Sequence, residues 1–260
     1  MRPRGSPARA PLAIPFRDPH HRSSPESVLG RLHEGQVRYG EISLAHHGVL
    51  LLDDLPLFSS TILQALPMVL EEGRVATSDP AVTLPAAVMF VGAMQPCPCG
   101  YFGHAQLRCR CSPEEGARYV TAVPASVWDR CDLQIEVPAV RFRDIVDTRR
   151  GESSASIRAR VEQARERQRA RFGDRAEGST NARMGLGEMK EHCRIGEGGE
   201  ALLRTAMTRC GLSARAYHGV LRVARTIADL DGSDDISTVH IAEAIQSRSS
   251  QYIRVGEVRT

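Results

Sequence analysis

The chain has 260 residues, of which 42% are hydrophobic and 25% are charged, and its formal net charge is +3. This composition excludes a disordered or fibrous protein and is enough for one large or two small globular domains. No uninterrupted apolar run approaches the length of a membrane-spanning helix, so we expect no membrane partner. The net charge is too small to identify a polyanionic partner.

The basic residues are almost all arginine, because Lys190 is the only lysine in the chain. A phosphate-binding Walker A loop has the pattern G-x-x-x-x-G-K-[ST] and requires a lysine. Lys190 is followed by Glu191 and has no glycine directly before it. The sequence therefore contains no Walker A loop.

The first residues, 1–14, are rich in proline, arginine and alanine without an apolar period, and we expect them to be disordered. An organellar transit peptide is the alternative, although the prolines oppose an amphipathic helix. Two pairs of adjacent histidines follow, His20-His21 and His46-His47. Adjacent side chains rarely converge on one metal ion, so we interpret both pairs as parts of polar turns.

The central stretch of the sequence is the apolar run Val49–Leu52, which ends in Asp53 and Asp54. The run predicts a strand buried on both faces, as in the middle of a parallel sheet. Acids at the carboxyl end of such a strand lie where open α/β sheets bind ligands. In P-loop ATPases the first acid holds Mg²⁺ and the second positions the attacking water, which is the Walker B arrangement. The alternative is an ordinary turn, because Asp-Asp before Leu-Pro also suits a loop.

A helix is expected after these acids, capped by Ser59 or Ser60 and bending or stopping at Pro67. A hairpin over residues 75–83 and a second buried strand over residues 87–93 follow. Gln95 comes directly after this strand. If the two strands are neighbours, its amide lies beside the twin aspartates and orients water or a γ-phosphate; a loop amide is the alternative.

Four of the seven cysteines form two C-x-C pairs within fifteen positions, namely Cys97, Cys99, Cys109 and Cys111. Without a signal for export, disulfides are not the first interpretation. Four thiolates in two close pairs favour a structural Zn²⁺ site, with redox-active or simply buried thiols as alternatives. The isolated cysteines are expected to be ordinary core thiols; they are Cys131, Cys193 and Cys210.

Arg130 lies between two acids and precedes a predicted strand over residues 133–137. It suits either a local ion pair or presentation to a neighbouring subunit's phosphate as an arginine finger. From about residue 147 the pattern becomes helical, with a domain boundary near Gly151. The arginine-rich helix expected through Phe172, capped by Ser153 or Ser154, suits a nucleic-acid backbone or, because glutamates interrupt it, a solvated face.

Three further helices are expected over residues 200–210, 214–230 and 238–247, the last two capped by Ser213 and Ser237. Arg215 falls in the first turn of the middle helix. The helix dipole gives a cation no benefit there, which indicates a functional role.

Taken together, these motifs resemble those of the magnesium chelatase-like AAA+ ATPases, and in particular their ComM-type branch of bacterial competence proteins. The resemblance extends from Pro15 to about Arg248. It rests on Pro15–His21, Gly40–Pro56, Gln95–Tyr101, Cys109–Pro113, Asp129-Arg130, Gly151–Ser154 and Leu212–His218.

The resemblance implies an α/β fold: an incomplete P-loop AAA+ parallel-sheet core over residues 15–147 with a four-cysteine insertion, a helical lid over residues 148–250, and a tail. It also implies a cytoplasmic ring that uses ATP with Mg²⁺ to remodel DNA branches in recombination and competence. Asp53 and Asp54 match the Walker B positions, with Asp53 on Mg²⁺. Gln95 matches sensor 1, Arg130 the finger acting in trans, and Arg215 the phosphate-contacting sensor 2.

Three departures from the family pattern affect this interpretation. The family carries a protease-like domain and a Walker A loop ahead of the Pro15–Arg17 segment, has glutamate at the position of Asp54, and usually has asparagine at that of Gln95. We therefore expect little or no ATP hydrolysis by this chain alone. Three interpretations follow: a split or truncated AAA+ ATPase, a non-catalytic zinc-containing interaction subunit of an AAA+ ring, or a subunit for metal insertion of the magnesium chelatase type.

Overall fold

The structure is a computed structural model that describes residues 14–77, 79, 81–104, 106–138, 140, 146, 151–173 and 180–248. The chain divides into two compact units, Met1–Arg130 and Cys131–Thr260. Most of the N-terminus that we expect to be disordered, residues 78 and 80 at the hairpin tip, and the tail lie outside the described residues. No helix in the described part of the chain is long and apolar enough to cross a membrane.

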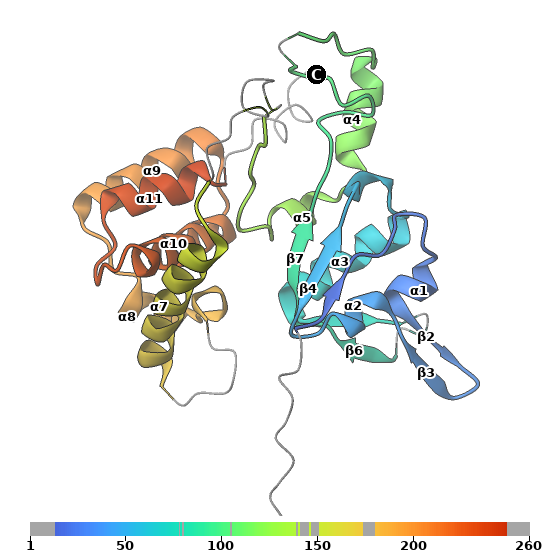
Figure 1. The fold of residues 1–260 in the computed structure, drawn as a ribbon, viewed down its shortest axis with the longest axis horizontal. Coiled ribbons are helices and arrows are strands. Elements are labelled where there is room, and N and C mark those ends of the chain that lie inside the picture. Colours follow the sequence, from blue (N-terminus) through green and yellow to red (C-terminus); the bar gives the residue numbers. More distant parts are fainter. Residues whose placement is uncertain are drawn as a thin grey trace, which may run out of the picture. The chain divides into compact units, whose positions relative to one another are not determined.

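The first unit is organised around a three-stranded parallel sheet (Figure 1). Its strands are β1 (Phe16–Arg17), β4 (Val49–Leu52) and β7 (Met89–Gly92), in the order β1-β4-β7. The register pairs Phe16 with Val49 and Val49 with Met89. The predicted α/β class is thus confirmed, and the two predicted strands, whose adjacency the sequence left open, are neighbours.

The helices that connect the parallel strands cover one face of the sheet. Strands β1, β4 and β7 follow each other in one direction, and right-handed crossovers then place the connecting helices on the same side. Leu50 and Leu52 of β4 point to this side and are fully buried. The connecting helices are α1 (Pro25–Leu29), α2 (Glu41–Leu44) and α3 (Ser60–Glu72). Two further helices follow β7: α4 (Pro113–Thr121), which lies beyond the strand ends in Figure 1, and α5 (Ala125–Trp128), which contacts α3.

The opposite face of the sheet is largely uncovered within this unit. The register places Phe16, Met89 and Val91 on that face, and their exposed fractions are 58%, 60% and 41%. Val49 and Leu51 of β4, on the same face, are half-buried. The expectation of a second strand buried on both faces is therefore wrong, because an apolar run reports strand formation and not how many faces are covered.

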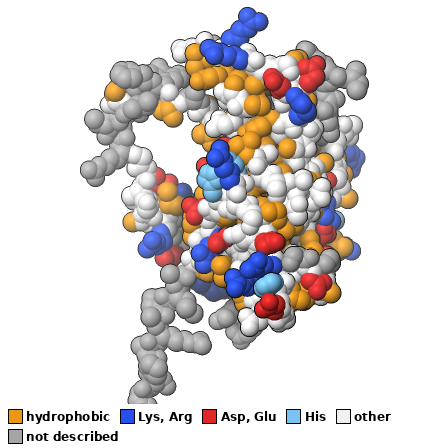
Figure 2. All heavy atoms as spheres, turned by 90° about the vertical axis from the view of Figure 1, so that its right-hand side faces the viewer, with side chains coloured by type: hydrophobic (Ala, Val, Ile, Leu, Met, Phe, Trp, Pro, Cys, Tyr) orange, Lys and Arg blue, Asp and Glu red, His pale blue; other side chains and the backbone are white. Residues whose placement is uncertain are grey.

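Two short antiparallel hairpins complete the unit: β2 (Gly30–His33) with β3 (Gln36–Tyr39), and β5 (Arg74–Ala76) with β6 (Thr83–Pro85). The second confirms the predicted hairpin. Of the two outcomes expected at Pro67, a bend or a stop, the stop does not occur: helix α3 continues to Glu72, because Ile62, Leu66 and Val69 hold both halves of it in the core. On the face drawn in Figure 2, acidic and basic side chains are interspersed and not separated by sign.

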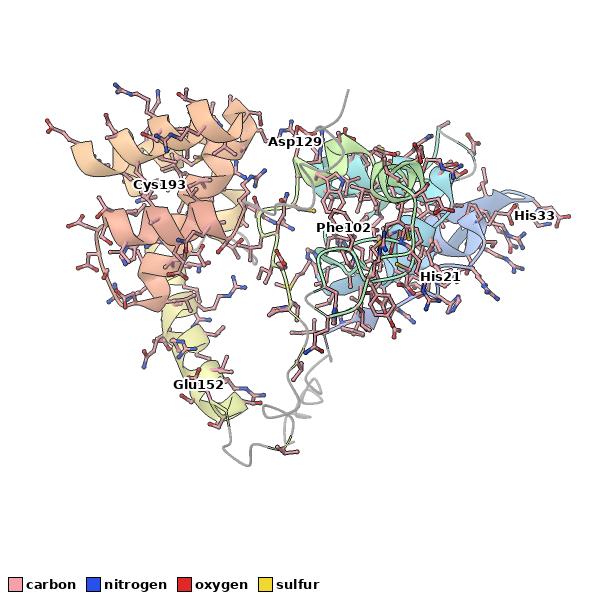
Figure 3. The ribbon with its side chains drawn as sticks, turned by 90° about the horizontal axis from the view of Figure 1, so that it is seen from above. His21, His33, Phe102, Asp129, Glu152 and Cys193 are labelled. Atoms are coloured by element: carbon pink, nitrogen blue, oxygen red, sulfur yellow. The ribbon has the colours of Figure 1, made fainter. Side chains whose placement is uncertain are left out.

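The second unit is helical, as predicted. It comprises α7 (Ser154–Phe172), η2 (Asn181–Arg183), α8 (Leu186–His192), α9 (Glu197–Cys210), α10 (Ala214–Leu230) and α11 (Thr238–Gln246). The predicted caps form: the hydroxyl oxygens of Ser153, Ser213 and Ser237 each accept a hydrogen bond from a backbone N–H in the first turn. Cys193 lies among these helices (Figure 3), buried beside Met184, as expected of a core thiol.

Residues 133–137 form no strand, contrary to prediction. Leu133, Ile135 and Val137 are exposed, and no described strand lies beside them. The backbone N–H of Gln134 donates to the carbonyl of Ser247, 2.6 Å away. Alternating apolar residues form a strand only where a partner edge is available.

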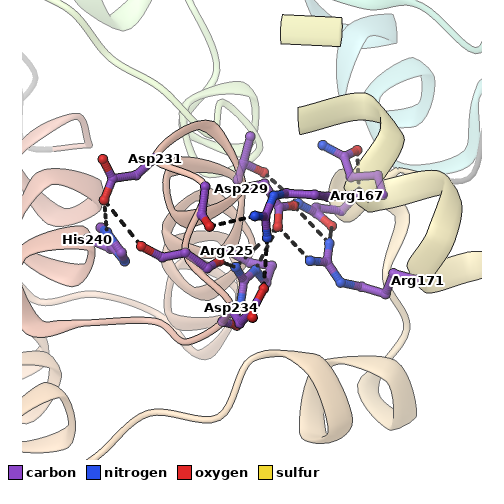
Figure 4. A network of polar contacts seen from close by, with 12 residues as sticks. Arg167, Arg171, Arg225, Asp229, Asp231, Asp234 and His240 are labelled. Carbon is purple, nitrogen blue, oxygen red and sulfur yellow. Dashed lines mark hydrogen bonds and ion pairs between the residues drawn. The ribbon is translucent and has the colours of Figure 1, made fainter. Parts of the chain in front are cut away.

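A buried polar network holds the helical unit together (Figure 4). The Asp229 carboxylate is fully buried and accepts hydrogen bonds from Arg171 at 2.5 and 2.8 Å, from Asn181 at 2.7 Å and from Arg225 at 3.2 Å. Arg167 of α7 pairs with Asp234 at 2.8 Å. These arginines of α7 are thus occupied inside the unit, which favours a structural role for them over contact with nucleic acid.

Candidate functional site

The two strands with polar tips end side by side. The N–H of Ala93, just after β7, donates to the carbonyl of Leu52 at 3.0 Å, and the N–H of Leu55 donates back to the carbonyl of Ala93 at 2.9 Å. Asp53, Asp54 and Gln95 therefore follow the carboxyl ends of neighbouring strands, at the same end of the sheet. The condition that the sequence required for a common site is met, while the roles of the three side chains remain predictions.

The turn at the tip of β4 is strained. Asp54 has left-handed backbone angles of φ 53° and ψ 45°, which non-glycine residues rarely adopt. The Asp53 carboxylate accepts a hydrogen bond from the Asp54 N–H at 2.9 Å and so supports this turn. Strain of this kind gathers at functional sites, although the same hydrogen bond also suits the ordinary-turn interpretation.

Tyr119 of α4 is a site residue that the sequence analysis missed. Burial raises its pKa, and the negative charges of Asp54 and Asp53 add to the rise. Its side chain lines one surface hollow together with Cys99, Cys111 and Pro56, which follows the aspartate tip. Nothing local marks this tyrosine, because its neighbours at the site lie far away in sequence.

Arg130, expected as the arginine finger, is held within its own unit. Its guanidinium forms an ion pair with Glu71 at the end of α3, and its Nη1 donates to the Ser126 carbonyl at 2.8 Å. The side chain is 18% exposed. Arg130 therefore forms an ion pair within its own unit, but its partner is Glu71, far away in sequence, and not one of the flanking aspartates. Action on a neighbouring subunit remains a prediction.

Arg215, expected as sensor 2, lies in the first turn of α10 and is exposed. It belongs to the second unit, whereas Asp53 and Gln95 belong to the first. Its proximity to a nucleotide phosphate therefore remains a prediction.

The four predicted metal ligands converge. The Sγ atom of Cys97 lies 3.5 Å from that of Cys99 and 3.6 Å from that of Cys109, and all four Sγ atoms, including that of Cys111, lie within 4.8 Å of one another. A tetrahedral Zn²⁺ with Zn–S bonds of about 2.3 Å requires sulfur atoms about 3.8 Å apart. The donor set and its spacing fit a closed structural zinc site.

Backbone geometry explains how the sequence forms this cluster. Gly100 has φ 80°, and its N–H donates to the Cys97 carbonyl at 2.9 Å, which closes the first turn. Directly after the last cysteine, Ser112 and Glu115 form a capping box that starts α4.

The thiols of the cluster differ in acidity. Backbone hydrogen bonds, that of Arg110 above all, lower the pKa of Cys99 to about 6, whereas burial raises the pKa of Cys111 to about 12. A bound metal cation would favour the thiolate form of all four. Burial raises the pKa of Cys131 and of Cys193 to about 11. Cys193 is buried, as expected for a core thiol, whereas Cys131 is half-buried.

Two family models match the chain. Residues 6–145 match magnesium chelatase, subunit ChlI, and residues 151–248 match the C-terminal part of the same subunit. The chain therefore belongs to the magnesium chelatase subunit ChlI family, with a parallel-sheet α/β core followed by a helical region.

Curated relatives share this family and are longer. The chain is 38% identical over 239 residues to competence protein ComM of Haemophilus influenzae, which covers 90% of the chain and 45% of ComM. It is 38% identical over 243 residues to YifB of Escherichia coli, with the same coverage, and 34% identical over 239 residues to a Mycobacterium tuberculosis protein. It thus spans less than half the length of these relatives.

Proposed function

We propose that this chain carries the Walker B and sensor side of an AAA+ ATPase site that is completed by a phosphate-binding loop from another polypeptide segment. One observation supports it: neighbouring parallel strands end side by side, and Asp53, Asp54 and Gln95 follow their carboxyl ends. Asp53 holds the Mg²⁺ of bound ATP, which is a usual role for an acid at a strand end. Asp54 and Gln95 orient the attacking water.

The sheet has room for the complementary segment. In the described residues no strand pairs with the outer edge of β7. The apolar face that carries Phe16, Met89 and Val91 is exposed, whereas parallel sheets are normally covered on both faces. A strand followed by a phosphate-binding loop and a helix would pair its strand with the outer edge of β7 and cover the exposed apolar face.

The remaining predicted roles concern assembly and substrate. Arg130 contacts the nucleotide of a neighbouring subunit in a ring after it leaves Glu71, and Arg215 contacts phosphate from the helical lid. Cys97, Cys99, Cys109 and Cys111 hold a structural Zn²⁺, which cross-links the two halves of their loop. The resemblance of the motifs supports DNA remodelling in recombination, in the cytoplasm, as the activity of the complete assembly, and the name of the Haemophilus influenzae relative, a competence protein, agrees with a role in competence.

A chimera tests the proposal. The matched segment of Haemophilus influenzae ComM is replaced by this chain, and phosphate release from Mg-ATP is measured for the chimera and for the chain alone. We expect release from the chimera, little or none from the chain, and a loss of at least about tenfold in the chimera with Asp53→Asn, because the metal ligand is removed. Asp79→Asn, away from the strand tips, is the matched control.

Two results would contradict the proposal. One is brisk hydrolysis by the chain alone that depends on Asp53. The other is a folded chimera that releases phosphate equally well with Asp53→Asn. A chimera that assembles but never hydrolyses ATP would favour the non-catalytic interaction subunit instead.

A further inference from the structure

The four-cysteine cluster, in the loop between β7 and α4 (Figure 1), borders two surface hollows. Cys109 and Cys111 line one hollow of about 650 Å³, and Cys99 and Cys111 line a second of about 540 Å³. Cys97 is buried, whereas the other three cysteines of the cluster are half-buried. A small solute can therefore reach sulfur atoms of the cluster from either hollow.

The surroundings of these thiols are basic. Arg108 and Arg110 line the first hollow, and Arg110 and Arg118 line the second. All three arginines are exposed. Glu115 also lines the second hollow, but its carboxylate is engaged in the cap of α4. Partly exposed thiols beside arginines are the ones that react with oxidants, whereas thiols buried in apolar surroundings, as Cys193 is, are inert.

The sulfur atoms of the cluster are close enough to form disulfides after a small movement. The Sγ atom of Cys109 lies 3.6 Å from that of Cys97 and 3.6 Å from that of Cys99. A disulfide bond is about 2.05 Å long, so a pair of these atoms has to approach by about 1.5 Å. Cys131 is half-buried too, but it lies outside the cluster.

We propose that the metal-loaded cysteine cluster is a redox switch, from which a peroxide releases Zn²⁺ by converting the four thiolates into two disulfides. The inference rests on the Zn²⁺ site of the proposed function, but not on its ATPase site. The cluster begins two residues after Gln95, so oxidation changes the segment that follows the strand tip.

The reaction balances with the peroxide as the oxidant. A zinc-bound thiolate sulfur attacks one oxygen of the peroxide: an S–O bond forms, the O–O bond breaks and hydroxide leaves. A neighbouring thiolate then attacks this sulfenic acid: an S–S bond forms, the S–O bond breaks and a second hydroxide leaves. Each hydroxide takes a proton and becomes water. Two such cycles consume two peroxides and four protons, oxidise four thiolates to two disulfides, and leave Zn²⁺ without ligands.

The test follows zinc release from the full chain, loaded with Zn²⁺ and treated with hydrogen peroxide. A colorimetric chelator measures the released ion, and mass spectrometry identifies the disulfides. We expect one zinc ion released for about two peroxides consumed, the balance given above, and uptake of zinc again after reduction with a dithiol.

Arg110→Gln should slow the release at least about threefold, because Arg110 lines both hollows and its charge stabilises the hydroxide that leaves. Arg158→Gln is the matched control, because Arg158 is an exposed arginine of α7 in the second unit, and it should leave the rate unchanged. Cys131→Ser should also leave the rate unchanged.

Four results would overturn the switch. These are zinc that stays bound while peroxide oxidises Cys131, zinc release only together with loss of the far-ultraviolet circular dichroism signal, oxidation that a dithiol does not reverse, and equal release rates in Arg110→Gln and Arg158→Gln. A chain that never binds zinc would overturn the metal site as well. No readout depends on ATP, so failure here is distinct from failure of the proposed ATPase role.

Discussion

Asp229 accepts hydrogen bonds from two largely buried arginines of the helical unit, Arg171 and Arg225. Arg171 and Arg225 donate to it, and their side chains are 13% and 3% exposed. Asp229→Asn keeps the shape of the side chain but removes its charge and places an amide donor against guanidinium donors. Two cations then remain buried without an anion between them.

Asp229→Asn should cause a large loss in the free energy of unfolding. Removing one partner of a buried ion pair typically costs about 3–5 kcal/mol, because the remaining charge stays desolvated. A domain's whole free energy of unfolding is about 5–15 kcal/mol, so the loss is a third or more in most of that range. Asp231 lies two residues further along the chain, and its side chain is 69% exposed. Asp231→Asn should therefore lower the free energy of unfolding by no more than about 0.5 kcal/mol.

The pH dependence has a definite sign. Burial raises the pKa of Asp229, but hydrogen bonds from Arg171 and Asn181 and the arginine charges outweigh it, so the pKa is lowered overall. The ionised carboxylate therefore stabilises the folded state fully above the unfolded pKa of about 3.9, and this stabilisation is lost as pH falls through the lower folded pKa. Asp229→Asn should remove this acid-sensitive part of the stability.

Urea unfolding followed by far-ultraviolet circular dichroism measures these free energies, at neutral pH and along an acid series. The reasoning would be refuted if Asp229→Asn lost less than about 1 kcal/mol, or if it and Asp231→Asn were equally stable. Retention of the acid-sensitive stability in Asp229→Asn would contradict the assigned role of its charge.

Two further predictions concern the first unit. Gly48→Ala should lower the free energy of unfolding by about 1–3 kcal/mol, because the new Cβ would lie 2.0 Å from the Pro15 carbonyl oxygen and push β1 from β4. Thermal unfolding measures the loss, and Gly116→Ala, with open space around it, is the control. Equal stability of the two variants would contradict the prediction. Cys109→Ser should lower bound zinc to well below one per chain, whereas Cys131→Ser should not. Elemental analysis of the purified chains measures the zinc content. Full zinc content in both variants would contradict the assignment of Cys109 as a metal ligand.

The sequence alone determined the local features of this protein. The apolar run Val49–Leu52 formed the central strand, serine residues capped α7, α10 and α11 where expected, and the cysteine spacing brought four thiols together. Each of these features depends on residues within one element or one loop. Side-chain pattern, capping and short loops therefore made them readable from the chain.

Only the tertiary structure decided which distant residues meet. It paired Arg130 with Glu71, 59 positions away, where the sequence offered flanking aspartates. It placed Tyr119 of α4 in one surface hollow with Pro56, left one face of the sheet uncovered, and left residues 133–137 without a partner strand. The physical reason is that side-chain contacts and strand pairing depend on how elements pack, and the residues that pack together are far apart in the chain.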